Sequence, residues 1–175
     1  MTGTVTIKDL VAAEVRRHAE DLATVLVDCV EGGASVSFML PFDMEQARKY
    51  WRGLEQAVAD GRAHVYAALQ GEILGGTVQL WLDTPDNQRH RGDIRKLLVH
   101  RSVRRLGLAT RLMLHAETEA RRLGLSLLTL DTVTASPAEK LYETLGWHKV
   151  GVIPRFALWP DGRFCDATFL YKEIG

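Results

Sequence analysis

The sequence has few cysteines and no long hydrophobic run. Its two cysteines, Cys29 and Cys165, lack the spacing of a metal-ligand set and are too few for a disulfide framework. No stretch approaches the roughly 18 apolar residues of a membrane helix. The amino-terminal stretch "MTGTVTIKDLVAAEVRRH" mixes charges into its apolar positions, unlike a signal peptide. We therefore expect a cytoplasmic protein with reduced cysteines, no membrane segment and no bound metal.

The chain also lacks net charge, because 22 Lys and Arg side chains balance 22 Asp and Glu side chains. A balanced chain has no overall field that attracts nucleic acid or membranes, so electrostatic arguments must be local. The 175 residues fit one ordinary domain, and no repeat, linker or low-complexity segment interrupts them. We expect a single domain over residues 1–175.

Hydrophobic periodicity and turn residues predict strands that alternate with helices in the second half of the chain. Asp43 and Gln46 have the spacing of a helix cap, and Gly71 has the setting of a hairpin turn. A strand, helix and strand in succession require a parallel or mixed sheet. The predicted strands are residues 4–7, 63–70, 73–82, 93–100, 125–131 and 148–153, followed by a hairpin that turns at 160–162; the predicted helices are 9–32, 43–61, 107–123 and 137–145.

The segment "SVRRLGLATRL", residues 102–112, passes from strand to helix through small and positively charged residues. The first turn of a helix has free N–H groups and a partial positive charge. Gly107 and Ala109 let a phosphate approach these N–H groups, Arg104 and Arg105 add full charges, and Thr110 adds a hydroxyl. The turn is predicted to bind a phosphate; alternatively, Gly107 only relieves a sharp turn between solvated arginines.

Two motifs resemble those of the GCN5-related N-acetyltransferase (GNAT) superfamily. The pattern Arg104-x-x-Gly107-x-Ala109 is similar to the family's acetyl-coenzyme A signature, (Gln/Arg)-x-x-Gly-x-(Gly/Ala). The segment "AEKLYETLGW", from Ala138 to Trp147, is similar to the family's A-x-x-L-Y-E-x-L-G-(F/W) helix. The resemblance implies an α/β GNAT fold: a central mixed, twisted sheet of about seven strands, splayed between its two central parallel strands, with about four flanking helices.

The resemblance also implies where acetyl-CoA binds. The pantetheine arm is expected along "KLLV", with backbone groups of Leu98 and Val99 serving its amides and an N–H near Val99 polarising the thioester. The same segment is also a buried strand. Many family members have an asparagine at the position of Ala135; its contact with the cofactor is expected to be either absent or replaced by Ser136. The expected cofactor-binding residues are Leu97, Leu98, Val99, Arg104, Arg105, Leu106, Gly107, Leu108, Ala109, Thr110, Ser136 and Tyr142.

The implied reaction is direct transfer of the acetyl group to an amine, or less often a hydroxyl, in a ternary complex, with coenzyme A as the product. A lysine-like ammonium has a pKa of about 10.4 and must lose a proton first, for which a carboxylate is suited. Asp131, at the carboxyl end of its strand, is the better placed base, and Asp93 is the second candidate. Alternatively, Asp131 caps its loop and Asp93 pairs with Arg91 or Arg95. Tyr142, the motif tyrosine, is expected to protonate the thiolate, or else to pack in the core.

The acceptor is expected to be a small amino-acid-like metabolite, toxin or antibiotic. "GGASVSFM", "LDT" after the fifth strand and the closing "PDGR" resemble the tabtoxin-resistance acetyltransferases, which acetylate a small β-lactam amino acid. The expected acceptor-binding residues are Ser35, Phe38, Trp81, Asp93 and Asp131.

Three other functions stay open at this point. The acceptor could be a protein or peptide amine, or the chain could be a catalytically silent acetyl-CoA sensor. Seven cations between Arg89 and Arg105 could bind nucleic acid, but strand alternation points them to different faces, so no nucleic-acid partner is expected. Analogy with relatives makes a homodimer possible.

Overall fold

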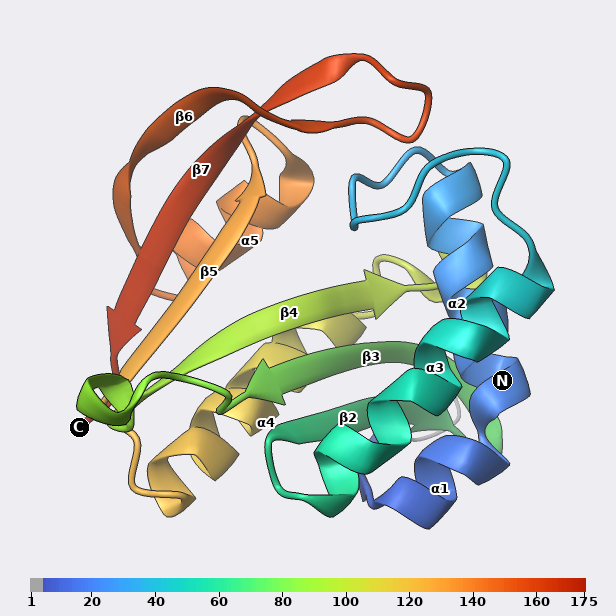
Figure 1. The fold of residues 1–175 in the computed structure, drawn as a ribbon, viewed down its shortest axis with the longest axis horizontal. Helices are drawn as coiled ribbons and strands as arrows, with labels where there is room; N and C mark the ends of the chain where they lie inside the picture. Colours follow the sequence, from blue (N-terminus) through green and yellow to red (C-terminus); the bar gives the residue numbers. More distant parts are fainter. Residues whose placement is uncertain (1–4) are drawn as a thin grey trace.

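The computed structural model describes residues 5–175, whose seven strands form one mixed sheet in the order β1-β2-β3-β4-β5-β7-β6. The fold is shown in Figure 1. The strands are β1 (Val5–Leu10), β2 (Ala63–Gln70), β3 (Ile73–Trp81), β4 (Arg91–Val99), β5 (Leu127–Val133), β6 (His148–Leu158) and β7 (Phe164–Glu173), and the α-helices are α1 (Ala12–Arg17), α2 (Ala19–Glu31), α3 (Met44–Ala59), α4 (Leu108–Arg122) and α5 (Pro137–Thr144).

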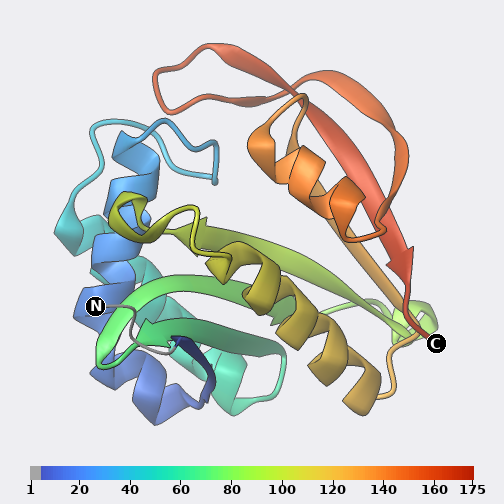
Figure 2. The ribbon, with the colours of Figure 1, turned by 180° about the vertical axis from the view of Figure 1, so that it is seen from behind.

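Helices cover both faces of the sheet. Figure 1 shows α1, α2 and α3 on one face, and Figure 2 shows α4 and α5 on the other. Each face has its own apolar cluster, one built around Trp51 and Leu26 and the other around Leu112 and Leu128. All strand pairs are antiparallel except β4 and β5, which are joined by α4. This arrangement confirms the predicted α/β fold with a seven-stranded mixed sheet.

The helices follow the sequence pattern with one difference. Asp43 caps α3: its carboxylate accepts the Gln46 N–H at 2.8 Å, and the Gln46 side chain accepts the Asp43 N–H at 2.9 Å. The single helix predicted over 9–32 is two helices that meet at His18. Val15 and Leu22 are both buried, so the helical spacing of apolar residues continues across the break. The sequence pattern therefore does not show where the first helix ends. None of the described helices is long and apolar enough to cross a membrane.

The strands also agree in number with the pattern, although their ends differ. The first predicted strand begins at Thr4, which lies outside the described residues, and β1 extends on to Leu10. Strands β2 and β3 form the predicted hairpin, with Gly71 at a φ of 64°. Strand β6 continues to Leu158, five residues beyond its predicted end.

Strands β4 and β5 pair over only three residues each. The pairing runs from Arg91 opposite Leu127 to Asp93 opposite Thr129, after which the strands diverge (Figure 1). A bulge in β4 lies beyond this point: Lys96 and Leu97 together oppose one residue of β3. Lys96 takes a left-handed φ of 51°. The sheet is therefore open between β4 and β5, as expected for the implied fold.

Two glycines in β3 let β4 and the loop before α4 approach closely. A Cβ on Gly76 would lie 2.9 Å from the carbonyl oxygen of Leu98, and one on Gly75 would lie 2.8 Å from Val103. Both distances are shorter than a carbon tolerates, so the end of β4 is held where only glycine fits.

Substituting Gly76→Ala should lower the free energy of unfolding by about 1–3 kcal/mol, because the added methyl group must displace strand backbone. The matched control is Gly53→Ala in α3, where a Cβ meets nothing within 4 Å. That change should raise the free energy of unfolding by about 0.5–1 kcal/mol, because alanine favours helix. Urea unfolding of the two variants measures both values. A Gly76→Ala variant as stable as the parent chain would contradict the close approach.

Candidate functional site

The turn before α4 forms a concavity of about 190 Å³ at the end of β4. Seven of the predicted cofactor-binding residues come together there, whereas Leu106 is 53% exposed and lies outside the lining. The lining consists of Val99, Val103, Arg104, Arg105, Gly107, Leu108, Ala109 and Thr110.

The backbone of this turn presents N–H groups to the concavity. Arg105 and Gly107 both adopt left-handed φ values, 68° and 78°. The first helical hydrogen bond of α4 runs from the Arg111 N–H to the Gly107 carbonyl at 3.1 Å. The three N–H groups before Arg111 consequently have no acceptor within the helix. Together with the helix dipole, they form a site for an anion.

Side-chain bonds fix the loop that leads into the turn. Arg104 donates from Nε to the Val99 carbonyl at 3.0 Å, which holds its guanidinium at the end of β4. Asp28, a buried residue of α2, accepts the Arg101 N–H at 2.9 Å and also binds the Arg101 guanidinium. The phosphate turn is thereby anchored to both β4 and α2.

Asp131 and Tyr142 lie on the β5 side of the gap. Tyr142 is 6% exposed, and its ring packs against that of Trp147 with centroids 6.0 Å apart. Burial, and secondarily the Asp131 carboxylate, raise the pKa of Tyr142. Desolvation by the surrounding protein raises the pKa of Asp131, while the charges of Lys96 and Arg95 oppose this rise. One of the two predicted catalytic groups, Asp131, therefore affects the pKa of the other, Tyr142.

Asp93 is bound on three sides. Its carboxylate pairs with Arg91 at 2.5 Å and with Arg95 at 3.4 Å, and it accepts a hydrogen bond from the Thr129 hydroxyl. Both ion pairs considered from the sequence are thus present. This carboxylate fastens the parallel strands at the last pair before they diverge.

Ser136 is engaged as a helix cap. Its Oγ accepts the Glu139 N–H at 3.2 Å, and the Glu139 carboxylate in turn binds the Ala135 N–H. Ala135 has a left-handed φ of 60°. The hydroxyl expected to contact the cofactor therefore already serves the start of α5.

Lys96 is a charged group in the gap that the sequence analysis did not single out. Burial, assisted by the charge of Arg95 and opposed by Asp131, lowers the pKa of Lys96 to about 8. Its Nζ donates to the Ser37 hydroxyl at 3.0 Å and lies 5.6 Å from the centre of the Phe38 ring. A lysine within the otherwise apolar "IRKLLV" was the available signal, but the bulge that turns it toward the loop cannot be read from the pattern.

A second concavity, of about 450 Å³, lies between α3 and β3. The buried Gln79 joins two of its aromatic walls: its amide oxygen accepts from the Trp81 indole at 2.9 Å, and its amide nitrogen donates to the Tyr50 hydroxyl at 2.9 Å. Arg95 lies over the Trp81 ring at 5.0 Å. The lining residues are Phe38, Gln46, Lys49, Tyr50, Gly53, Leu54 and Trp81.

Of the predicted acceptor-binding residues, Phe38 and Trp81 meet in this concavity and Ser35 does not. The Ser35 hydroxyl donates to the Leu158 carbonyl at 2.7 Å. The Leu40 N–H bonds to the Pro160 carbonyl at 2.9 Å. These contacts tie the loop between α2 and α3 to the hairpin of β6 and β7, beside which it lies in Figure 1.

The cations between Arg89 and Arg105 are divided among separate partners. Arg89 pairs with Asp86, Arg91 with Asp93, and Arg101 with Asp28.

Comparisons with known proteins agree with this geometry. The model of the acetyltransferase (GNAT) family matches residues 34–147. The structure of yncA from Salmonella typhimurium with its cofactor acetyl-CoA is 17% identical and superposes with a TM-score of 0.79, covering 98% of this chain and 95% of that one. A ribosomal-protein-alanine N-acetyltransferase from Brucella melitensis is 20% identical, with a TM-score of 0.78 and coverage of 96% and 99%. A protein described as a phosphinothricin N-acetyltransferase is 16% identical, with a TM-score of 0.80 and coverage of 98% and 99%.

Lysine titration followed by NMR should find Lys96 with a pKa of about 8, below the usual value. In an Asp131→Asn variant the pKa of Lys96 should fall further, because the ammonium loses the carboxylate that favours its charged form. The control is Asp83→Asn, which removes an exposed carboxylate paired with Arg62 and should leave Lys96 unchanged. If the measured pKa of Lys96 equalled that of the other lysines, its burial in the gap would be contradicted.

Proposed function

Because the chain belongs to the acetyltransferase (GNAT) family, we propose that it transfers the acetyl group of acetyl-CoA to an amine, or a hydroxyl, of a small amino-acid-like molecule. The observation that carries the proposal is the opening between β4 and β5, which has the phosphate turn at the end of β4 and Asp131 and Tyr142 across the gap. The gap thus combines an anion site with titratable groups suited to acyl transfer.

The residues of the turn fit the diphosphate of coenzyme A. The N–H groups of Leu108, Ala109 and Thr110 lack intrahelical acceptors, and two arginines border the same concavity. A carbon side chain at Gly107 would be strained, because the residue has a φ of 78°. Among residues 5–175, the β4 backbone has no strand partner on the gap side after Asp93, so it can pair with the pantetheine amides.

In this proposal Asp131 accepts the proton that the acceptor ammonium must lose before its nitrogen attacks the acetyl carbon. Its raised pKa makes the carboxylate a stronger base than an ordinary aspartate. Asp93 is less suited, since Arg91 and Arg95 neutralise it. The pair of catalytic carboxylates considered from the sequence thereby reduces to one base and one structural residue.

Tyr142 stabilises the departing thiolate. A phenol with a raised pKa remains protonated at neutral pH and yields its proton less readily than a free tyrosine. Hydrogen-bond donation to the sulfur as the carbon–sulfur bond breaks is therefore favoured over complete transfer of the proton. The acceptor nitrogen loses two protons in all: Asp131 passes the first to solvent, and the second is balanced by the proton that the thiolate takes up to become the free thiol of coenzyme A.

The second concavity supports a small acceptor with an anionic group. Its walls are aromatic, Lys49 is part of its lining, and Arg95 covers Trp81 at its edge. Lys96, which contacts Ser37 and Phe38, adds a cation between this pocket and Asp131. An amino acid offers a carboxylate to these cations and an amine to Asp131, which agrees with the resemblance to tabtoxin-resistance acetyltransferases.

The decisive test measures thiol release from acetyl-CoA with amino acids, β-lactam amino acids, phosphinothricin, polyamines, aminoglycosides and peptides as acceptors. We expect turnover with a zwitterionic small molecule. Preference for a peptide amine would assign a protein substrate. Calorimetric binding of acetyl-CoA without turnover on any acceptor would indicate a sensor. Absence of acetyl-CoA binding would contradict the proposal as a whole.

A Tyr142→Phe variant should lower kcat roughly 100-fold, because the thiolate loses its hydrogen-bond donor. The KM for acetyl-CoA should change little, since the phosphate turn is unaltered. Steady-state kinetics with the best acceptor of the panel provides the measurement. The matched control is Tyr171→Phe on β7, whose ring packs on His148 at 5.4 Å and whose loss of a hydroxyl should not alter kcat. Equal rates in the two variants would exclude the role of Tyr142.

A further inference from the structure

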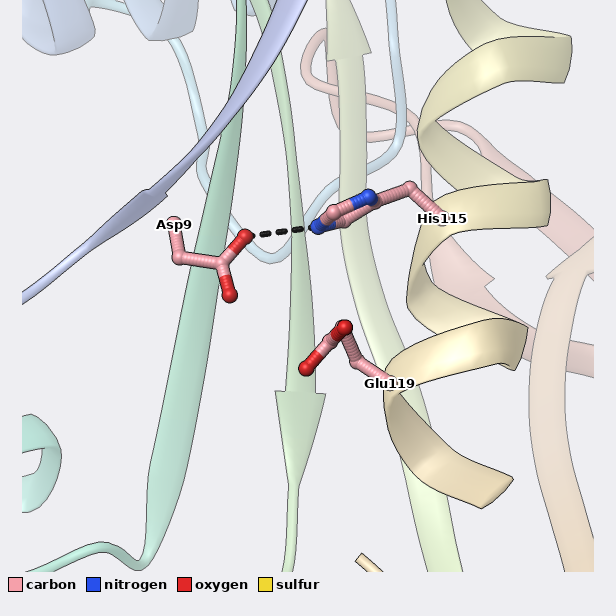
Figure 3. Close-up of side chains that lie close together, drawn as sticks. All are labelled: Asp9, His115 and Glu119. Carbon is pink, nitrogen blue, oxygen red and sulfur yellow. Dashed lines mark hydrogen bonds and ion pairs between the residues drawn. The ribbon is translucent and has the colours of Figure 1, made fainter. Parts of the chain in front are cut away.

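Three side chains with metal-binding groups converge from β1 and α4. Asp9 projects from β1, and His115 and Glu119 project from α4, as Figure 3 shows. One potential ligand atom from each residue lies within 4.8 Å of the other two. The His115 Nε2 and the Asp9 carboxylate are already 2.6 Å apart. None of the three belongs to the proposed acetyltransferase site.

The fold itself creates this convergence. His115 and Glu119 are four residues apart on α4, so their side chains share one face of the helix. Asp9 pairs directly with Tyr66 across β1 and β2, so both side chains project from the same face of the sheet. The Tyr66 ring meets the His115 ring edge-on, with centroids 5.0 Å apart, which places that face beneath α4.

A buried hydroxyl adjoins the cluster without a partner. Tyr66 is 2% exposed, and its hydroxyl forms no hydrogen bond within residues 5–175. An unsatisfied buried donor costs free energy and calls for an explanation. The Tyr66 ring lies against His115, with centroids 5.0 Å apart, so a hydrogen-bond acceptor for the hydroxyl is expected at the cluster. An oxygen of a metal-bound carboxylate or water would supply one.

His64 adds a nitrogen donor to the same face. It lies two residues before Tyr66 on β2, and their rings stack with centroids 6.4 Å apart. His64 is not one of the three residues whose ligand atoms lie within 4.8 Å of one another, so it borders the cluster and is not part of the donor set.

We propose that Asp9, His115 and Glu119 bind one divalent transition-metal ion of the zinc type, with the Tyr66 hydroxyl donating to a carboxylate or water of the bound ion. An imidazole nitrogen with two carboxylates is a donor set for such ions, whereas Mg²⁺ and Ca²⁺ prefer oxygen alone. The two carboxylates bring negative charge to the ion. Arg122 pairs with one oxygen of Glu119 at 2.7 Å, which orients this carboxylate and offsets part of its charge.

The site can adjust to the ion at little cost. Ligands at about 2.0–2.2 Å from a tetrahedral zinc are roughly 3.3 Å apart, so the side chains must shift slightly. The Asp9 side chain is 51% exposed and that of His115 is 28% exposed, which gives both room to move and gives the ion access from solvent. The ion replaces the proton between Asp9 and His115, and its binding joins β1 to α4.

The test uses the full chain without an affinity tag, freed of metal with a chelator and titrated calorimetrically with ZnCl₂ or MgCl₂. One Zn²⁺ should bind per chain, with no comparable heat from Mg²⁺. CoCl₂ should give the visible absorption of cobalt in a low-symmetry site. Because the folded chain alone has this site, a hundredfold excess of Zn²⁺ over Kd should raise the melting temperature by roughly 5–10 °C.

Three variants separate the site from nonspecific binding. His115→Ala should abolish stoichiometric Zn²⁺ binding, whereas the exposed His90→Ala should retain it. Tyr66→Phe should weaken Zn²⁺ binding about 10-fold and yet leave the metal-free protein at least as stable, because the hydroxyl it removes is unpartnered. A tyrosine with a purely structural role would not combine weaker Zn²⁺ binding with unchanged or higher stability of the metal-free protein. Failure of the wild-type chain to bind one Zn²⁺, unchanged binding in His115→Ala, or loss of binding in His90→Ala would overturn the proposal.

Discussion

The parting of β4 from β5 after Asp93 is the constraint on which the proposed active site depends. Parallel strands that stayed paired to their ends would satisfy each other's backbone and leave no place for a ligand. Asp93, held by Arg91, Arg95 and Thr129, fastens the last pair. Beyond it, the β4 bulge at Lys96 redirects the strand, and the glycines of β3 permit the close approach of its end.

The opening also determines the electrostatics of the site. Lys96 from the bulge, Asp131 from β5 and Tyr142 from α5 are brought into one partly desolvated region. There Lys96 and Asp131 shift each other's pKa, and Asp131 raises the pKa of Tyr142. Burial raises the pKa of the carboxyl and the phenol and lowers that of the amine, so all three are moved toward their neutral forms. Shifted pKa values of this kind, raised for acids and lowered for an amine, are common where proton transfer accompanies a reaction.

The two proposed sites lie on different parts of α4. Its first turn faces the phosphate concavity, whereas His115 and Glu119, about two turns farther on, face β1 and β2. A metal ion at the second location would secure the helix whose first turn provides the anion site. Helix α4 thus carries residues of both proposed sites. Each proposal depends on different residues of the helix and is tested separately.

The sequence by itself determined the elements whose signals are local. The Asp43 cap, the Gly71 hairpin and the arginine–glycine turn before α4 each depend on residues a few positions apart, and the two family motifs predicted the α/β fold. Only the tertiary structure decided which distant groups meet. The break at His18, the bulge at Lys96 and the meeting of Asp9 with His115 and Glu119 arise because strand register and helix packing set side-chain directions, and neither is contained in a local pattern.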